Sequence, residues 1–247
     1  MNEKQLLLDQ NKNPVFFFDL DDTLYQRSDP FTRACNIMFS TRFILDWEKV
    51  FEARRNYGDQ VFEASQDGSM TLEESYIFRT THAFKDFGQD LSPKEALLFE
   101  QCFEECLAHI TLEPGMKEVL QFLKNRSVPM AILTNGPGPH QRKKLFSLQA
   151  DNWIPEANWY ISGEMSAAKP HPEIYTAAVA GMRCKPRDSW MIGDSLTHDI
   201  EGAAACGWHT IWYNRKRQSP AFFSPDKTAA DPARLMEIIS SIILSNG

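Results

Sequence analysis

Acidic side chains follow the first apolar run of the sequence, at a position where they could take part in chemistry. The run at 15–18 consists of four apolar residues, and Asp19, Asp21 and Thr23 come directly after it in the pattern Asp-Leu-Asp-Asp-Thr. Open α/β sheets bind ligands beside the carboxyl ends of their strands, so both aspartates could reach such a crevice if the strand gives way to a loop. In isolation, this pattern is also compatible with an ordinary acidic turn.

Three further segments place polar residues at the ends of predicted strands or in a loop before a predicted helix. They are Thr134-Asn135-Gly136, Ala168-Lys169-Pro170 and Gly193-Asp194-Ser195, with Asp199 five residues beyond Asp194. Taken one at a time, they read as a strand-end hydroxyl, a solvated lysine and an acidic helix cap. Together with the acids that follow the first run, they supply a nucleophile, a nearby cation, hydroxyl and amide donors, and carboxylates for Mg²⁺, which are the groups that phosphoryl transfer requires.

The elements that must position these residues alternate along the chain. Short apolar runs predict buried strands at 15–18, 129–134, 190–193 and 210–213, and a weaker one at 159–162. Helical patterns begin near Pro114, cover about 172–182 and 197–207, and resume after Pro232. Strands that are apolar throughout and alternate with helices predict a doubly wound parallel α/β sheet.

One long interval, from about residue 29 to residue 110, breaks this alternation because it shows helical patterns and no strand pattern. Thr71-x-x-Glu74 and Ser92-x-x-Glu95 have the spacing of helix-starting capping boxes. We therefore expect an all-helical domain inserted after the first strand. The expected boundaries are residues 25–111 for this insert and residues 1–24 with 112–247 for the α/β core.

The composition excludes several classes of protein. Of 247 residues, 26 are Lys or Arg and 33 are Asp or Glu, which gives a formal net charge of −7. Sequence-independent nucleic-acid binding depends on cationic neutralisation of phosphates, so we expect no nucleic-acid partner. No apolar run approaches the roughly 18 residues of a membrane helix, so we expect no membrane partner. Five cysteines without a Cys-x-x-Cys pair favour reduced thiols. We expect a cytoplasmic monomer or homodimer.

The four polar segments resemble the four motifs of the haloacid dehalogenase-like (HAD) superfamily. Asp19-x-Asp21-x-Thr23 is similar to its first motif, Thr134 to its second, Lys169 to its third, and Gly193-Asp194-x-x-x-x-Asp199 to its fourth. The resemblance covers the core from about residue 14 to residue 213, and no motif residue is missing. It implies a Rossmann-like HAD core, and it implies that the helical insert is the α-helical cap of that family.

The resemblance also implies a role for each matched residue. Asp19 would be the nucleophile that forms an aspartyl-phosphate, and Asp21 would protonate the leaving oxygen and then activate water. Mg²⁺ would be held by Asp19, the backbone carbonyl of Asp21 and Asp194, with Asp199 nearby or acting through water. Phosphoryl oxygens would be bound by Thr134 and Lys169, together with the amides of Asn135 and Gly136.

The second acid, Asp21, separates branches of the family, because the dehalogenase pattern lacks an acid at this position. Its presence favours phosphoryl transfer over cleavage of a carbon–halogen bond, so we expect a Mg²⁺-dependent phosphomonoester hydrolase that acts on a small phosphorylated metabolite. The motifs look most like the nucleotidase and sugar-phosphatase branch, and a nucleoside 5′-monophosphate is the substrate that we expect first. A sugar-phosphate or phosphoglycolate phosphatase and a phosphomutase remain alternatives. A phospho-receiver domain or a metabolite-binding protein would be a non-enzymatic alternative.

Overall fold

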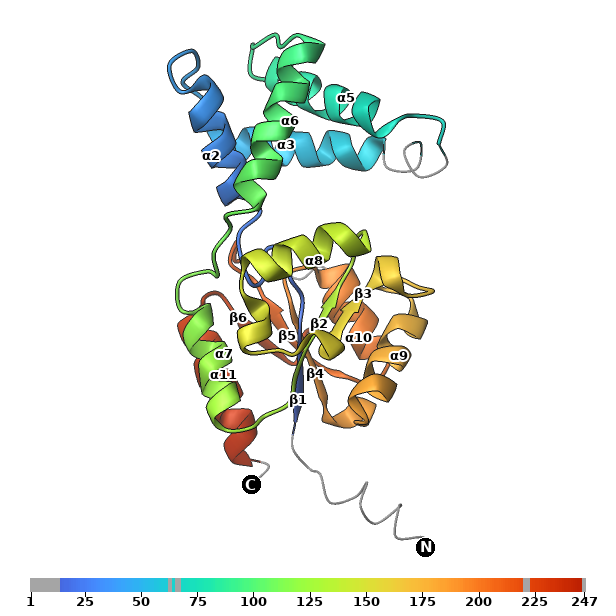
Figure 1. Ribbon diagram of the computed structural model, residues 1–247. Coiled ribbons are helices and arrows are strands. Elements are labelled where there is room, and N and C mark those ends of the chain that lie inside the picture. The colour runs from blue at the N-terminus through green and yellow to red at the C-terminus, as the bar shows by residue number, and fades with distance from the viewer. Residues whose placement is uncertain (1–13, 62–63, 65–67, 220–222, 246–247) are drawn as a thin grey trace, which may run out of the picture. The chain divides into compact units, whose positions relative to one another are not determined.

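The computed structural model describes residues 14–61, 64, 68–219 and 223–245. The chain divides into two compact units, one formed by Met1–Tyr25 with Thr111–Gly247 and the other by Gln26–Ile110 (Figure 1). We call the first the core unit and the second the helical unit.

Among its described residues, the core unit contains a six-stranded parallel sheet in the order β3-β2-β1-β4-β5-β6. The strands are β1 (Val15–Phe18), β2 (Met130–Thr134), β3 (Trp159–Ile161), β4 (Ser189–Gly193), β5 (His209–Tyr213) and β6 (Lys227–Ala229). This confirms the predicted doubly wound α/β fold and adds β6, which the apolar pattern does not predict. Because β1 pairs with both β2 and β4, the carboxyl ends of these three strands are neighbours.

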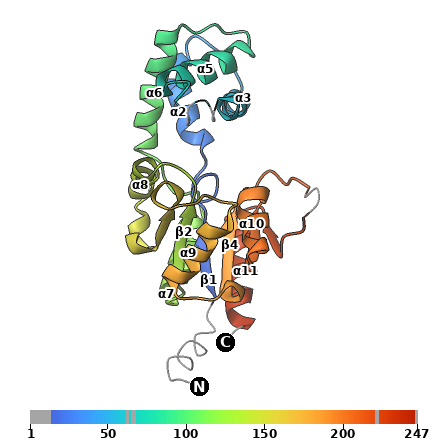
Figure 2. The ribbon, with the colours of Figure 1, turned by 90° about the vertical axis from the view of Figure 1, so that its right-hand side faces the viewer.

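Helices cover both faces of this sheet (Figures 1 and 2). One face carries α7 (Met116–Asn125) and α11 (Pro232–Ser245), and the other carries α9 (Pro172–Met182) and α10 (Gly202–Ala205). The fully buried Phe17 of β1 packs against Trp208, with ring centroids 4.4 Å apart, in the core cluster beneath α9. Burial on both faces explains why β1 reads as an unbroken apolar run.

Two elements near the carboxyl edge of the sheet differ from the predicted ones. In place of a single helix over 197–207, the structure has a π-helical turn, η5 (Leu196–Glu201), followed by α10. In addition, α8 (Gly138–Ser147) follows β2 where no helix is predicted. Most of its residues are polar, and Leu145 is its one buried large apolar residue, so it lacks the apolar periodicity that marks an amphipathic helix.

The helical unit is built from α2 (Ser28–Phe39), α3 (Trp47–Gln60), α5 (Leu72–Lys85) and α6 (Pro93–Leu107), and no strand occurs among its described residues. The two predicted capping boxes are confirmed at the starts of α5 and α6. Phenylalanines fill its interior, and the rings of Phe31 and Phe99 pack edge to face with their centroids 5.2 Å apart. Within the described parts of both units, no helix combines the length and the apolar character needed to cross a membrane.

Candidate active site

The carboxyl ends of β1, β2 and β4 bring three of the predicted site residues together. Asp19 is the first residue after β1, Thr134 is the last residue of β2, and Asp194 is the first residue after β4. The Asp19 backbone N–H donates to the carbonyl of Ile192 at 2.9 Å, which ties the turn after β1 to β4. Strand order, rather than nearness in sequence, therefore assembles the site.

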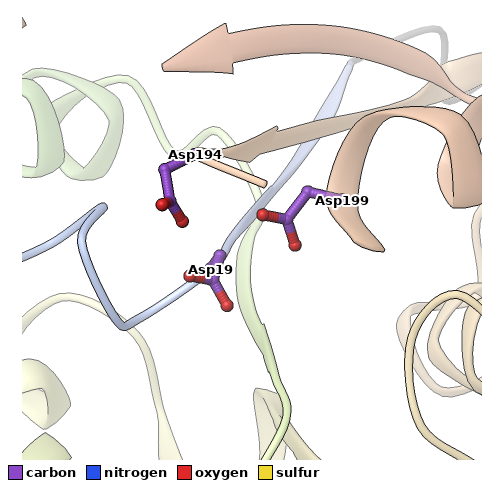
Figure 3. Close-up of side chains that lie close together, drawn as sticks. All are labelled: Asp19, Asp194 and Asp199. Carbon is purple, nitrogen blue, oxygen red and sulfur yellow. The ribbon is translucent and has the colours of Figure 1, made fainter. Parts of the chain in front are cut away.

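Three of the predicted acids form a compact group. Asp19, Asp194 and Asp199 each offer a carboxylate oxygen, and these three oxygens lie within 4.8 Å of one another. Figure 3 shows Asp194 and Asp199 directed toward the side chain of Asp19. Asp19 and Asp199 are buried. An all-oxygen, anionic donor set of this size fits a hard divalent cation such as Mg²⁺.

The predicted lysine occupies the same group of acids. Lys169 Nζ donates to Asp19 Oδ1 and to Asp199 Oδ1, both at 2.6 Å, and to the Leu133 carbonyl at 2.8 Å. Burial raises the pKa of Asp19, and Lys169 opposes that rise. Burial also disfavours the charge on Lys169, yet the two carboxylates raise its pKa above the ordinary value. The two carboxylates therefore favour the charged form of Lys169 within the site.

The loop that carries Lys169 is held by the side chain of Asn135. Asn135 Nδ2 donates to the Lys169 carbonyl at 2.8 Å, and the Lys169 backbone N–H donates to Asn135 Oδ1 at 2.9 Å. The next residue, Gly136, donates its backbone N–H to Ser162 Oγ at 3.0 Å. Both residues thus lie beside the site, where the side chain of Asn135 positions the lysine and the Gly136 amide contacts a neighbouring hydroxyl.

Asp199 is placed by a close approach between η5 and the end of β4. Its Oδ2 accepts the backbone N–H of Ser195 at 3.0 Å, while its Oδ1 accepts from Lys169. A Cβ atom on Gly193 would lie 2.2 Å from Asp199 Oδ2, a distance that no side chain tolerates. Glycine at the end of β4 is therefore required for Asp199 to reach the site.

Asp21, the second acid of the first motif, is held differently. Lys144 Nζ donates to Asp21 Oδ1 at 2.7 Å and to Oδ2 at 2.8 Å, and the Tyr25 hydroxyl also donates to Oδ1. Gln141 Nε2 donates to Oδ2 at 3.1 Å. The Asp21 carboxylate is not part of the three-acid group. The described site therefore contains three clustered acids and a fourth acid that is paired with Lys144.

Gln141 and Lys144 are functional candidates that sequence reasoning missed. Both are buried on α8, and Gln141 Nε2 also lies 2.7 Å from Thr134 Oγ1 and 3.0 Å from the Asn135 carbonyl, so its two hydrogens are shared among three acceptors. The sequence does offer one signal. Gln141 and Lys144 follow the strand-end Thr-Asn-Gly and are three positions apart, which puts both side chains on one face of a helix. Without an apolar pattern, that helix was not predicted.

Residues 14–207 match the family described as haloacid dehalogenase-like hydrolase. The chain is 24% identical over 208 residues to a glyceraldehyde 3-phosphate phosphatase of Pyrococcus furiosus, covering 81% of this chain and 80% of that protein. It is 26% identical over 225 residues to the human N-acylneuraminate-9-phosphatase, covering 85% of this chain and 86% of that protein. A ribulose-1,5-bisphosphate 5-phosphatase of Halopiger xanaduensis is 26% identical, covering 87% and 90%.

Solved structures show the same fold. A Bacillus subtilis protein described as a HAD-hydrolase, bound to magnesium, has a TM-score of 0.70 at 22% identity, covering 92% of this chain and 98% of that one. An L-2-haloacid dehalogenase of Xanthobacter autotrophicus has a TM-score of 0.67 at 13% identity, covering 93% and 99%. The matched family confirms the resemblance that the four motifs indicate.

Proposed function

The chain belongs to the haloacid dehalogenase-like hydrolase family, and we propose that it is a Mg²⁺-dependent phosphomonoester hydrolase that works through an aspartyl-phosphate. The observation that carries this proposal is the second carboxylate, Asp21, held beside Asp19 but outside the three-acid group. An ester oxygen needs a proton as it leaves, whereas a halide does not. The three relatives named above are phosphatases, which supports the same reaction.

Asp19 and Asp194 are the side chains that would hold Mg²⁺, together with the backbone carbonyl of Asp21. Both oxygens of Asp199 already accept hydrogen bonds, from Lys169 and from Ser195, so Asp199 would act from nearby or through water. When bound, the cation would offset negative charge on the phosphoryl group and on the acids.

The chain's own residues would carry the two steps. In the first, an oxygen of Asp19 attacks phosphorus, the bond from phosphorus to the ester oxygen breaks, and Asp21 gives that oxygen a proton. In the second, the Asp21 carboxylate takes a proton from water as the water attacks phosphorus. The bond to Asp19 then breaks and inorganic phosphate leaves. Throughout, Lys169 and Thr134 would hold the phosphoryl oxygens.

The balance of charge in the described site supports a divalent cation. The site contains four carboxyl groups and two buried lysines, Lys144 and Lys169. The negative charges exceed the positive ones by two when all four acids are ionised, and by one when Asp21 carries the proton that the first step requires. A phosphomonoester dianion would be repelled by either excess, and a divalent cation would offset it.

The substrate is proposed as a small phosphorylated metabolite. A nucleoside 5′-monophosphate remains the substrate suggested by the motifs, while the names of the relatives favour a phosphorylated sugar or sugar acid. Both classes present a phosphate on a primary alcohol, so the chemistry proposed for Asp19 and Asp21 is the same for each.

A screen of phosphate release tests this proposal. Purified protein is assayed with Mg²⁺ on nucleoside 5′-monophosphates, sugar phosphates, phosphoglycolate and p-nitrophenyl phosphate, and Asp19→Asn controls for contaminating phosphatases. We expect phosphate release by the wild type alone. Conversion of one sugar phosphate into another without phosphate release would indicate a phosphomutase. Binding without turnover of any compound, p-nitrophenyl phosphate included, would contradict an enzymatic function.

A further inference from the structure

We propose that Lys144 and Gln141 of α8 are positioning residues, which hold the Asp21 carboxylate in the orientation it needs for proton transfer. This inference rests on the proposed function, because it concerns the acid–base step assigned to Asp21. Neither residue belongs to the four motifs, and neither is required by the three-acid group.

Lys144 grips both oxygens of Asp21, at 2.7 Å and 2.8 Å, with a side chain that is almost completely buried. Burying an ammonium is costly unless a partner replaces its water. Its neighbour Lys143 on the same helix is exposed, so α8 does not bury its lysines as a matter of course. The buried position of Lys144 is therefore explained by Asp21 and not by the polarity of the helix.

Gln141 joins Asp21 to the second motif. Its Nε2 lies 3.1 Å from Asp21 Oδ2 and 2.7 Å from Thr134 Oγ1, and the residue is 1% exposed. A single amide thus contacts both the acid assigned to the leaving oxygen and the hydroxyl assigned to the phosphoryl oxygens. This bridge fixes the distance between the two groups that would act on opposite sides of the breaking bond.

Three donors on two oxygens leave the Asp21 carboxylate little freedom to rotate. Tyr25 and Lys144 contact Oδ1, while Lys144 and Gln141 contact Oδ2. Proton transfer requires the acid within hydrogen-bond reach of the leaving oxygen, and a misplacement of about 1 Å can cost roughly a hundredfold in rate. Removal of Lys144 should therefore lower kcat through Asp21 and leave KM nearly unchanged.

The test combines two substrates with a double-mutant comparison. Lys144→Met, Gln141→Leu and the exposed control Lys143→Met are assayed on p-nitrophenyl phosphate and on the best alkyl phosphate of the screen. Lys144→Met is then repeated in the Asp21→Asn background, and thermal unfolding is recorded for every variant. An aryl leaving group needs little protonation, so a defect that acts through Asp21 must be smaller on p-nitrophenyl phosphate.

We expect Lys144→Met to lower kcat on the alkyl phosphate by about tenfold to a hundredfold and on the aryl phosphate by much less. In the Asp21→Asn background, the same change should cost less than about twofold, because residues acting as one unit are not additive. Gln141→Leu should show the same pattern more weakly, and Lys143→Met should behave as wild type. Lys144→Arg, which can still reach both oxygens, should recover part of the lost rate.

Equal losses on the two substrates, or the same loss with and without the Asp21 carboxyl, would overturn the inference. If Lys144→Met does not fold, Gln141→Leu decides by the same two criteria. If the proposed function itself is wrong, Asp21→Asn will lose as much activity on p-nitrophenyl phosphate as on the alkyl phosphate. A normal Asp21→Asn signature with an unaffected Lys144→Met refutes the positioning role alone.

Discussion

Asp19 is the residue on which the proposed chemistry depends, and its surroundings make a charged carboxylate costly. Burial raises its pKa, Lys169 lowers it, and Asp199, Asp194 and Asp21 raise it again. A raised pKa disfavours the ionised nucleophile, and further positive charge beside Asp19 would favour it. This is a physical reason, independent of the motifs, to expect a divalent cation next to Asp19.

Replacing that nucleophile gives the first prediction. Asp19→Asn keeps the size of the side chain but removes the attacking oxygen, so kcat should fall by roughly three orders of magnitude or more. Thermal unfolding should change little or improve, since a buried carboxylate among other acids is removed. Steady-state phosphate release checks the rate. Retention of about a tenth of wild-type turnover would rule out covalent catalysis by Asp19.

Among individual residues, the positions of the motif residues can be predicted from the sequence, whereas the residues that contact Asp21 cannot. Asp19, Thr134 and Asp194 stand at strand ends, so period and composition place them at one edge of the sheet. Lys144 and Gln141 act through contacts more than a hundred positions away from Asp21 in the sequence. The sequence alone does not distinguish a buried lysine that is paired with a distant carboxylate from a lysine exposed to solvent.

Among the elements, the junction of β4 with η5 is the one that most constrains the site. Gly193→Ala would place a Cβ atom 2.2 Å from Asp199 Oδ2 and push Asp199 away from Lys169. We predict a destabilisation of about 1–3 kcal/mol and a loss of most activity. Gly58→Ala, on α3, is the matched control, because its Cβ would come no closer than 3.9 Å to another side chain. Urea unfolding and phosphate release measure the two effects, and a fully active Gly193→Ala would contradict this placement of Asp199.

The capping box at the start of α6 gives a pH-dependent prediction for the helical unit. Hydrogen bonds from Ser92, with help from Arg42, lower the pKa of Glu95 to about 2 from an ordinary 4.5. A depressed carboxyl pKa stabilises the fold above pH 4.5, and this stabilisation is lost as the pH falls toward 2.

Glu95→Gln should therefore lower Tm at neutral pH, with a difference from wild type that narrows as the pH falls from about 5 to about 3. Circular dichroism melts across this range measure the difference. Glu105→Gln, at an exposed position late in the same helix, controls for the loss of one negative charge from α6. A Tm difference for Glu95→Gln that is independent of pH would mean that the carboxylate is not the stabilising group.

The sequence predicts the strands that are buried along their length, but it does not predict α8, whose buried contacts are polar, or the short strand β6. The apolar runs of β1, β2, β4 and β5 are buried along almost their whole length, and the weaker β3 is also present. By contrast, α8 buries the polar side chains of Gln141 and Lys144, and β6 is a three-residue edge strand with two exposed residues. Neither leaves a periodic signal in the sequence.

For the molecule as a whole, the residues of the proposed site all lie in one of the two units. The acids Asp19, Asp21, Asp194 and Asp199 and the lysines Lys144 and Lys169 belong to the core unit. The motifs therefore report a reaction class, and they leave the choice between a nucleotide and a sugar phosphate to the screen.

Metal binding should be visible in the stability of the intact protein. A ligand that binds only the folded state at a hundred times its Kd stabilises that state by about 2.7 kcal/mol. We expect Mg²⁺ to raise Tm and EDTA to abolish turnover. Ca²⁺, which takes more ligands at longer distances, should not restore turnover. Asp194→Asn should lose the Mg²⁺-dependent rise in Tm, while the exposed control Asp151→Asn should keep it. Full activity with Ca²⁺ alone would contradict a magnesium site.

The central claim is that the phosphoryl group passes through Asp19, and trapping the phosphoenzyme tests it most directly. Wild-type protein with Mg²⁺ is mixed with ³²P-labelled substrate from the screen, quenched in acid within milliseconds, and digested for mass spectrometry. We predict a phosphorylated peptide whose label is released by hydroxylamine, as expected of an acyl phosphate, with the modification on Asp19 and none in Asp19→Asn. Rapid turnover with no phosphoenzyme at any quench time, or with the label on another residue, would contradict the proposed mechanism.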